Sequence, residues 1–226
     1  MDKLKQNIIL FDLDGTLTDP GLGITNSVMH ALNHYGIHVA DRSELYKFIG
    51  PPLSQSFERF YGFSKEDAHH AVDVYREYFS VKGLFENEVY PGIKELLKEL
   101  KAQGKVLCLA TSKPEIYAKQ ILEHFELDGY FDFVSGSLLS GERTDKAEVI
   151  AWAMHSLTQM GLDCDPGHMV MIGDREHDIL GAHKNQLPAI GVLFGYGSAE
   201  EFEEANAEAM AETVEALRVM LTGEHE

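Results

Sequence analysis

Short apolar runs alternate with longer amphipathic segments along this chain, and this alternation restricts its fold more than any other feature. The runs at 105–111 and 168–173 are apolar almost to their ends, which suits strands buried on both faces of a parallel sheet. The apolar runs predict strands at about residues 7–13, 105–111, 131–135, 168–173 and 188–193. The sequence therefore predicts an α/β fold, a Rossmann-like, doubly wound parallel sheet with helices on its faces.

The segments between these runs predict the helices. Leucine and isoleucine recur at helical spacing after residue 92, and Gly104 follows as a C-terminal stop, so a helix is expected over 92–103. Further helices are expected at about residues 114–125, 144–161, 175–186, 199–206 and 213–221.

The interval between the first two predicted strands is too long for a simple crossover. It reads as helical, with a break at Gly50-Pro51-Pro52 and a helix start at Ser64, which is followed by acidic residues. We therefore expect a small helical domain over residues 18–90, inserted into a core domain made of residues 1–17 and 91–226.

Two aspartates one residue apart follow the first predicted strand, in the run Asp12-Leu13-Asp14-Gly15-Thr16. Residues i and i+2 of a strand point the same way, so Asp12 and Asp14 can share one face at the carboxyl end of the sheet. Neighbouring carboxylates repel each other unless a cation or a proton relieves them. The run therefore indicates a divalent metal site, with Mg²⁺ the expected ion, and a plain Asp-Gly turn is the alternative.

Polar residues follow three further predicted strands. Thr111-Ser112 offers hydroxyls and backbone N–H groups to an oxyanion, with helix capping as the alternative. Lys146 begins a helix, where the helix dipole favours acids, and its alternative is an ordinary surface position. Asp174 and Asp178 lie one helical turn apart after an apolar strand and can both face a metal, and capping by Asp174 is the alternative.

The order of these features resembles the haloacid dehalogenase (HAD) superfamily of phosphohydrolases. The family's motifs are matched by Asp12-Leu13-Asp14-Gly15-Thr16, Thr111, Lys146, and Asp174 with Asp178. The inserted helical domain resembles the cap of the phosphoglycolate phosphatase and 5′-nucleotidase-like branch. The resemblance covers essentially the whole chain.

The resemblance implies a role for each matched residue. Asp12 is the expected nucleophile, which forms an aspartyl-phosphate, and Asp14 is the expected general acid and base. Mg²⁺ is expected on Asp12, Asp174 and the backbone carbonyl of Asp14, with Asp178 either a further ligand or a support for the other ligands. Thr111 and Lys146 are expected to bind phosphoryl oxygens. The expected substrate contacts are Thr16 and Ser112 in the core domain and Gly23, Ile24, Thr25 and Pro52 in the cap.

The expected function is therefore Mg²⁺-dependent hydrolysis of a small phosphorylated metabolite, such as a 5′-nucleotide or phosphoglycolate. A sugar-phosphate mutase on the same fold is the main alternative, with transfer to a second hydroxyl in place of water. A dehalogenase is a weaker alternative because it needs neither an acid at Asp14 nor a metal. A phosphorylated receiver that does not turn over is disfavoured by the large cap and by the Asp-x-Asp-Gly-Thr spacing.

Composition limits the partners. The formal net charge of −18 over 226 residues argues against binding to nucleic acid or to an anionic membrane surface. There is no apolar run of membrane-spanning length and no signal-peptide pattern, and the two cysteines suggest a reducing compartment, so a cytoplasmic protein is expected. Both a monomer and a homodimer are compatible with the sequence.

Overall fold

The computed structural model describes residues 7–223, which divide into two compact units. Residues 7–18 and 89–223 form the core unit, and Asp19–Glu88 forms the helical unit. The boundaries lie one residue and two residues from those expected from the sequence. Where the chain crosses between the units, β2 (Thr18–Asp19) and β3 (Glu88–Val89) form a separate two-stranded sheet.

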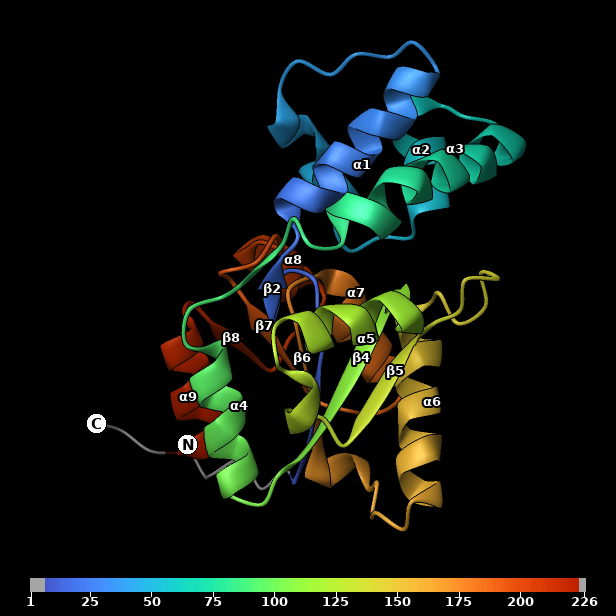
Figure 1. Cartoon of the computed structure of the whole chain (residues 1–226). Coiled ribbons are helices and arrows are strands. Elements are labelled where there is room, and N and C mark those ends of the chain that lie inside the picture. The colour runs from blue at the N-terminus through green and yellow to red at the C-terminus, as the bar shows by residue number, and fades with distance from the viewer. Residues whose placement is uncertain (1–6, 224–226) are drawn as a thin grey trace. The chain divides into compact units, whose positions relative to one another are not determined.

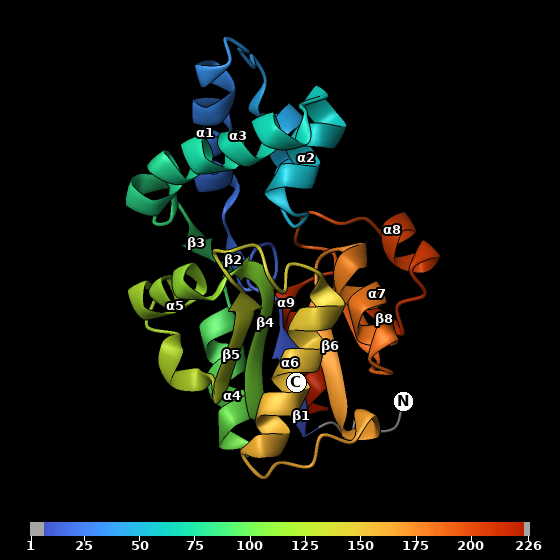
Figure 2. The same cartoon turned by 90° about the vertical axis from the view of Figure 1, so that its right-hand side faces the viewer.

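The core unit is built on a six-stranded sheet in the order β5-β4-β1-β6-β7-β8, and all neighbouring strands are parallel. Since β1 lies between β4 and β6, successive crossovers leave it in both directions, as in a doubly wound sheet. This confirms the predicted fold class (Figures 1 and 2). The strands are β1 (Ile8–Phe11), β4 (Val106–Pro114), β5 (Phe133–Ser137), β6 (Met169–Gly173), β7 (Ala189–Val192) and β8 (Ala209–Ala211).

Helices cover both faces of this sheet. One face carries a continuous apolar cluster, in which Ile8 and Leu10 of β1 pack with side chains from α6, α7 and α8. Helices α4 and α9 contact each other on the opposite side of the sheet from α6 (Figures 1 and 2). The helices of the core unit are α4 (Ile93–Ala102), α5 (Glu115–His124), α6 (Lys146–Gln159), α7 (Glu176–Lys184), α8 (Ala199–Glu204) and α9 (Val214–Thr222).

Two strands differ from the sequence prediction. Strand β8 was not expected, because its three residues, Ala-Met-Ala, are too few to show a periodicity, and it forms by pairing with β7. Strand β4 continues to Pro114, three residues beyond its expected end, with a register shift between Thr111 and Pro114. This irregular end of β4 carries the polar residues discussed below.

The helical unit packs its helices closely. Its elements are α1 (Gly21–His34), the 3₁₀ segment Arg42–Phe48, α2 (Leu53–Tyr61), α3 (Lys65–Tyr78) and a π-helical turn at Phe79–Gly83. Ser64 caps α3 by accepting from the Asp67 amide, which confirms the expected helix start. A Cβ at Gly23 would lie 1.9 Å from the carbonyl oxygen of Gly83, so only glycine permits this approach of α1 to the π-helical turn.

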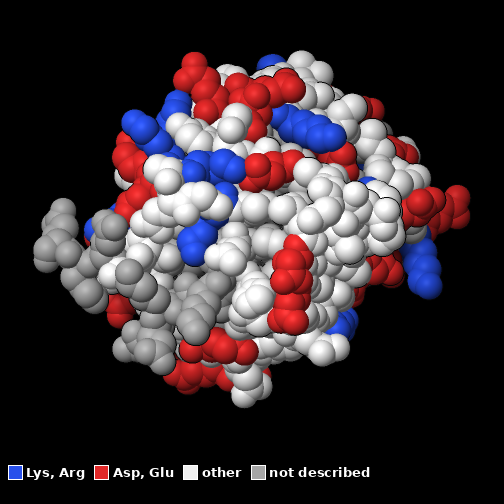
Figure 3. Space-filling view, turned by 90° about the horizontal axis from the view of Figure 1, so that it is seen from below, with Lys and Arg blue, Asp and Glu red and all other residues white. Residues whose placement is uncertain are grey.

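Charged side chains are interspersed on the face shown in Figure 3, where Lys and Arg occur in small groups among Asp and Glu. A membrane-crossing helix is not found between residues 7 and 223, since none there combines sufficient length with sufficient apolar character.

Candidate active site

The first motif forms a tight turn directly after β1. The Asp12 amide donates to the carbonyl oxygen of Ile172 on β6 at 2.9 Å, which continues the sheet pairing into the motif. Gly15 has φ +82°, a conformation that favours glycine, and its amide donates to the carbonyl oxygen of Thr18 at 2.7 Å. The turn leaves Asp12 and Asp14 only 5% and 9% exposed, so two carboxyl groups are buried at the end of the central strand.

The second acidic motif lies at the end of β6, which is the neighbour of β1. Asp174 accepts a hydrogen bond from the Tyr196 amide at 2.9 Å through Oδ2. Asp178, in the first turn of α7, accepts from the Arg175 amide at 3.1 Å. The N-cap of α7 is Arg175, so the alternative in which Asp174 caps this helix is wrong.

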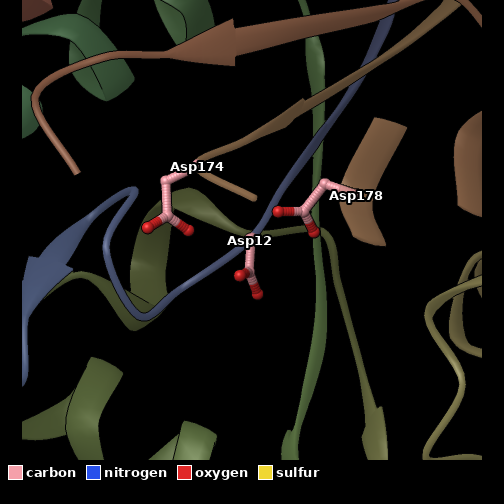
Figure 4. A group of neighbouring side chains, drawn as sticks. All are labelled: Asp12, Asp174 and Asp178. Atoms are coloured by element: carbon pink, nitrogen blue, oxygen red, sulfur yellow. The ribbon is translucent and has the colours of Figure 1, made fainter. Parts of the chain in front are cut away.

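Asp12, Asp174 and Asp178 form one cluster of buried carboxylates (Figure 4). One oxygen of each lies within 4.8 Å of the others. The Oδ1 atom of Asp174 is buried and accepts no hydrogen bond from residues 7–223. Three hard oxygen donors with an unpartnered buried oxygen fit a divalent cation such as Mg²⁺.

Lys146 joins two of these carboxylates. Its Nζ lies 2.8 Å from Oδ1 of Asp12 and 2.7 Å from Oδ1 of Asp178, and it donates to the carbonyl oxygen of Ala110 at 3.0 Å. Burial alone lowers the pKa of Lys146, but the carboxylates of Asp12 and Asp178 raise it, and the net shift is upward. Lys146 is therefore a buried cation, and the surface alternative is wrong.

One lysine does not neutralise the cluster. Burial raises the pKa of Asp174 well above its usual value, and the neighbouring carboxylates of Asp178 and Asp12 raise it further. Burial also raises the pKa of Asp178, to about 6, although Lys146 opposes the shift. These carboxyl groups therefore hold protons more readily than exposed ones. A bound cation would stabilise their ionised forms by offsetting the repulsion between the buried negative charges.

The hydroxyl residues lie at the same edge of the sheet. Thr111 is buried at the irregular end of β4, and its Oγ1 accepts from the Lys113 amide at 3.3 Å. Ser112 is half-buried, and the N-cap position of α5 is Pro114 without a side-chain cap, so the capping alternative is wrong. Thr16 is fully buried, and its hydroxyl has no hydrogen-bond partner among the described residues.

Lys113 was not among the site residues expected from the sequence. Its Nζ lies 2.5 Å from Oδ2 of Asp14, and the exposure of this lysine is only 9%. Burial raises the pKa of Asp14, whereas Lys113 lowers it, and the net shift is upward. The available signal was position, because Lys113 follows Thr111 at the end of a strand next to β1.

The four predicted cap contacts lie in the helical unit. Gly23, Ile24 and Thr25 are buried in the first turns of α1, and Thr25 Oγ1 donates to the Gly21 carbonyl oxygen. Pro52 is half-buried before α2. Their contact with substrate stays a prediction.

Gly15 offers a test of how tightly this site is packed. A Cβ at Gly15 would lie 2.0 Å from Oδ2 of Asp174, whereas Gly104 has a similar φ of +75° and open space around it. Gly104→Ala is expected to lower the free energy of unfolding by about 1 kcal/mol through backbone strain alone. Gly15→Ala adds the clash and is expected to lower it by about 3 kcal/mol. If urea denaturation shows the same loss of unfolding free energy for both variants, the Asp174 side chain moves away from the added Cβ without destabilising the protein.

Comparison with known proteins shows the family to which the chain belongs. A family model for haloacid dehalogenase-like hydrolases matches residues 9–192. The chain belongs to this family. A 5′-nucleotidase of Pseudomonas aeruginosa is 48% identical to this HAD-family chain over 94% of both sequences. The crystal structure of a predicted phosphatase from Clostridium acetobutylicum superposes with a TM-score of 0.92 at 49% identity, covering 97% of this chain and 99% of the other.

More distant relatives of this HAD-family chain differ in their names. A phosphoglycolate phosphatase of Vibrio parahaemolyticus is 27% identical over 93% of both chains. The tyrosine-protein kinase PtkA of Mycobacterium tuberculosis is 36% identical over 95% of this chain and 72% of its own length. The family, the 5′-nucleotidase and the predicted phosphatase together identify the chain as a phosphomonoester hydrolase, which confirms the predicted enzyme class.

Proposed function

We propose that this protein is a Mg²⁺-dependent phosphatase that hydrolyses a small phosphomonoester, a 5′-nucleotide or a phosphoglycolate-like compound, through an aspartyl-phosphate on Asp12. One observation carries the proposal. The buried Asp12 carboxylate lies beside the Lys146 ammonium and within the Asp174 and Asp178 cluster, at the end of the central strand. The Lys146 ammonium holds the nucleophile in this position, and a cation bound by the carboxylate cluster would help it to attract a phosphoryl group.

The residues divide the reaction into two steps. In the first, an Asp12 carboxylate oxygen attacks phosphorus, the ester P–O bond breaks, and the departing oxygen takes a proton from the Asp14 carboxyl. In the second, Asp14 takes a proton from a water molecule whose oxygen attacks phosphorus, and the bond to Asp12 breaks. Lys146 orients Asp12, and the hydroxyls of Thr16, Thr111 and Ser112 bind the other phosphoryl oxygens.

Asp12, Asp174 and Asp178 would hold Mg²⁺, with the backbone carbonyl of Asp14 as a further ligand. When bound, the cation neutralises negative charge on the phosphoryl group and on the attacking carboxylate. The helical unit would then act as the cap that selects the substrate, with Gly23, Ile24, Thr25 and Pro52 among its contacts.

The 5′-nucleotidase relative at 48% identity favours a 5′-nucleotide as substrate. The kinase relative favours a second candidate, phosphoryl transfer to a protein tyrosine, since it is 36% identical over nearly the whole chain. The two functions differ in their acceptor. Release of inorganic phosphate requires water to attack, whereas a kinase leaves phosphate on a protein.

The test is phosphate release from a panel of nucleoside 5′-monophosphates, phosphoglycolate, hexose phosphates and p-nitrophenyl phosphate, with and without Mg²⁺. Metal-dependent release from one class supports the proposal and identifies the substrate. An isomerised hexose phosphate without phosphate release would support the mutase instead. Transfer of a labelled phosphoryl group from a nucleoside triphosphate to a protein tyrosine, without phosphate release from any monoester, would support the kinase.

Mg²⁺ binding should weaken on acidification. A carboxyl must lose its proton to hold the cation, and burial raises the pKa of Asp178 to about 6 and that of Asp174 in the same direction. At pH 5 the Mg²⁺ dissociation constant measured by calorimetry is expected to be at least about tenfold higher than at pH 7.5. Equal affinity at both pH values would show that these carboxyls are ionised throughout.

In the metal-free protein, the raised pKa of Asp178 makes the folded state more stable at low pH than at high pH. Because the folded state binds the Asp178 proton more tightly than the unfolded chain does, the free energy of unfolding should fall as the pH rises from 3.8 through about 6. Urea denaturation in a chelator at pH 5 and pH 7.5 measures this contribution.

A further inference from the structure

Two buried lysines serve different carboxylates in the core unit. Lys146, from α6, contacts Asp12 and Asp178. Lys113, from β4, contacts Asp14 across 99 residues of sequence. Leaving a lysine at a buried position is unfavourable unless it has a partner of opposite charge, so the pairing of Lys113 with Asp14 is a specific feature of this fold.

The two oxygens of Asp14 are not equivalent. Oδ2 accepts a hydrogen bond from Lys113 Nζ, whereas Oδ1 is buried and has no hydrogen-bond partner among residues 7–223. A buried carboxylate oxygen without a partner is uncommon in folded proteins and is available to a ligand. The lysine therefore fixes the carboxylate by one oxygen and leaves the other free.

The irregular end of β4 explains how Lys113 comes to lie there. The strand changes register between Thr111 and Pro114, and the Lys113 amide donates to Thr111 Oγ1. This local turn is built by the same residues that supply the hydroxyls of the site. The placement of Lys113 is thus coupled to that of Thr111.

We propose that Lys113 is a positioning residue for Asp14. It holds Oδ2, so that Oδ1 is presented first to the oxygen of the departing group and then to the attacking water. The inference rests on the proposed function, in which Asp14 transfers these protons. It adds a residue through which Asp14 acts, and Lys113 itself need not touch the substrate.

Leaving-group dependence tests this role. p-Nitrophenolate departs readily without a proton, whereas the alkoxide of a nucleoside or of glycolate needs one. Lys113→Met should therefore lower kcat/KM for the best alkyl phosphate by at least about tenfold more than for p-nitrophenyl phosphate. The control is Lys119→Met, which removes an exposed lysine paired with Glu115 in α5 and should leave both values unchanged.

Two further variants separate positioning from packing. Lys113→Arg retains the charge and should lose less activity on the alkyl substrate than Lys113→Met does. If circular dichroism shows that Lys113→Met is unfolded, Lys113→Gln replaces it in the same comparison. In an Asp14→Asn background, Lys113→Met should change the remaining rate less than about twofold, because its effect passes through Asp14.

The outcomes distinguish the inference from the function on which it rests. A wild-type protein that releases phosphate from no monoester contradicts the proposed function. An active wild type in which the Lys113 variants lose equally on both substrates overturns the positioning role alone. A raised KM with unchanged discrimination between leaving groups would assign Lys113 to the substrate's phosphate, and would also overturn it.

Discussion

Asp12→Asn is expected to lower kcat for phosphate release by at least about a thousandfold, because an amide oxygen is a poor nucleophile at phosphorus. The change keeps the size of the side chain. The hydrogen bond from residue 12 to the Ile172 carbonyl oxygen of β6 is also kept, because its donor is the backbone amide. We therefore expect the folded structure to persist while turnover is lost. Phosphate release with the best substrate of the panel, together with circular dichroism, measures both.

The matched control is Asp163→Asn, since the Asp163 side chain is 79% exposed and precedes β6, whereas Asp174 follows this strand at its other end. It should retain the wild-type rate. Near-normal turnover by Asp12→Asn would show that another group attacks phosphorus, and loss of turnover in both variants would point to a general defect.

Asp174→Ala is expected to raise the half-saturating Mg²⁺ concentration by about a hundredfold. Asp174 is fully buried, and its Oδ1 accepts no hydrogen bond from the described residues, so a cation is the natural partner of this oxygen. Mg²⁺ binding measured by calorimetry, without substrate, should weaken in parallel with the activity titration.

Asp174→Asn provides the control for packing, because an amide oxygen can still accept from the Tyr196 amide. If Asp174 binds the metal, both variants should weaken Mg²⁺ binding, since both remove the charge. Loss in Asp174→Ala with normal binding in Asp174→Asn would assign Asp174 to holding the Tyr196 segment. Titrations of both variants that overlay the wild type would contradict the ligand role.

Much of the candidate site can be predicted from the sequence alone. Parallel strands end at the same edge of the sheet, so Asp12 after β1, Thr111 near the end of β4 and Asp174 after β6 come together whatever the details of the loops. The expectation that Lys146 is functional rested on a mismatch with the helix dipole. The structure shows that Lys146 is buried between Asp12 and Asp178, and its role in the reaction stays a prediction.

Other features have no local signal. Strand β8 is three residues long and forms only because β7 offers an unpaired edge. The Tyr196 amide reaches Asp174 across 22 residues, through a loop whose course depends on β7 and α8. Burial of Gly23 and Thr25 inside the helical unit likewise depends on how its helices pack.

The sequence by itself determined the fold class, the family and the order of the site residues, because the alternation of apolar runs and the spacing of their polar ends follow from backbone geometry. Only the tertiary structure decided which charges pair. Lys113 and Lys146 are both lysines near helix or strand ends, yet one contacts Asp14 and the other Asp12 and Asp178. Ion pairing in a buried site depends on distances of a few ångströms between distant segments, and these exist only once the sheet has formed.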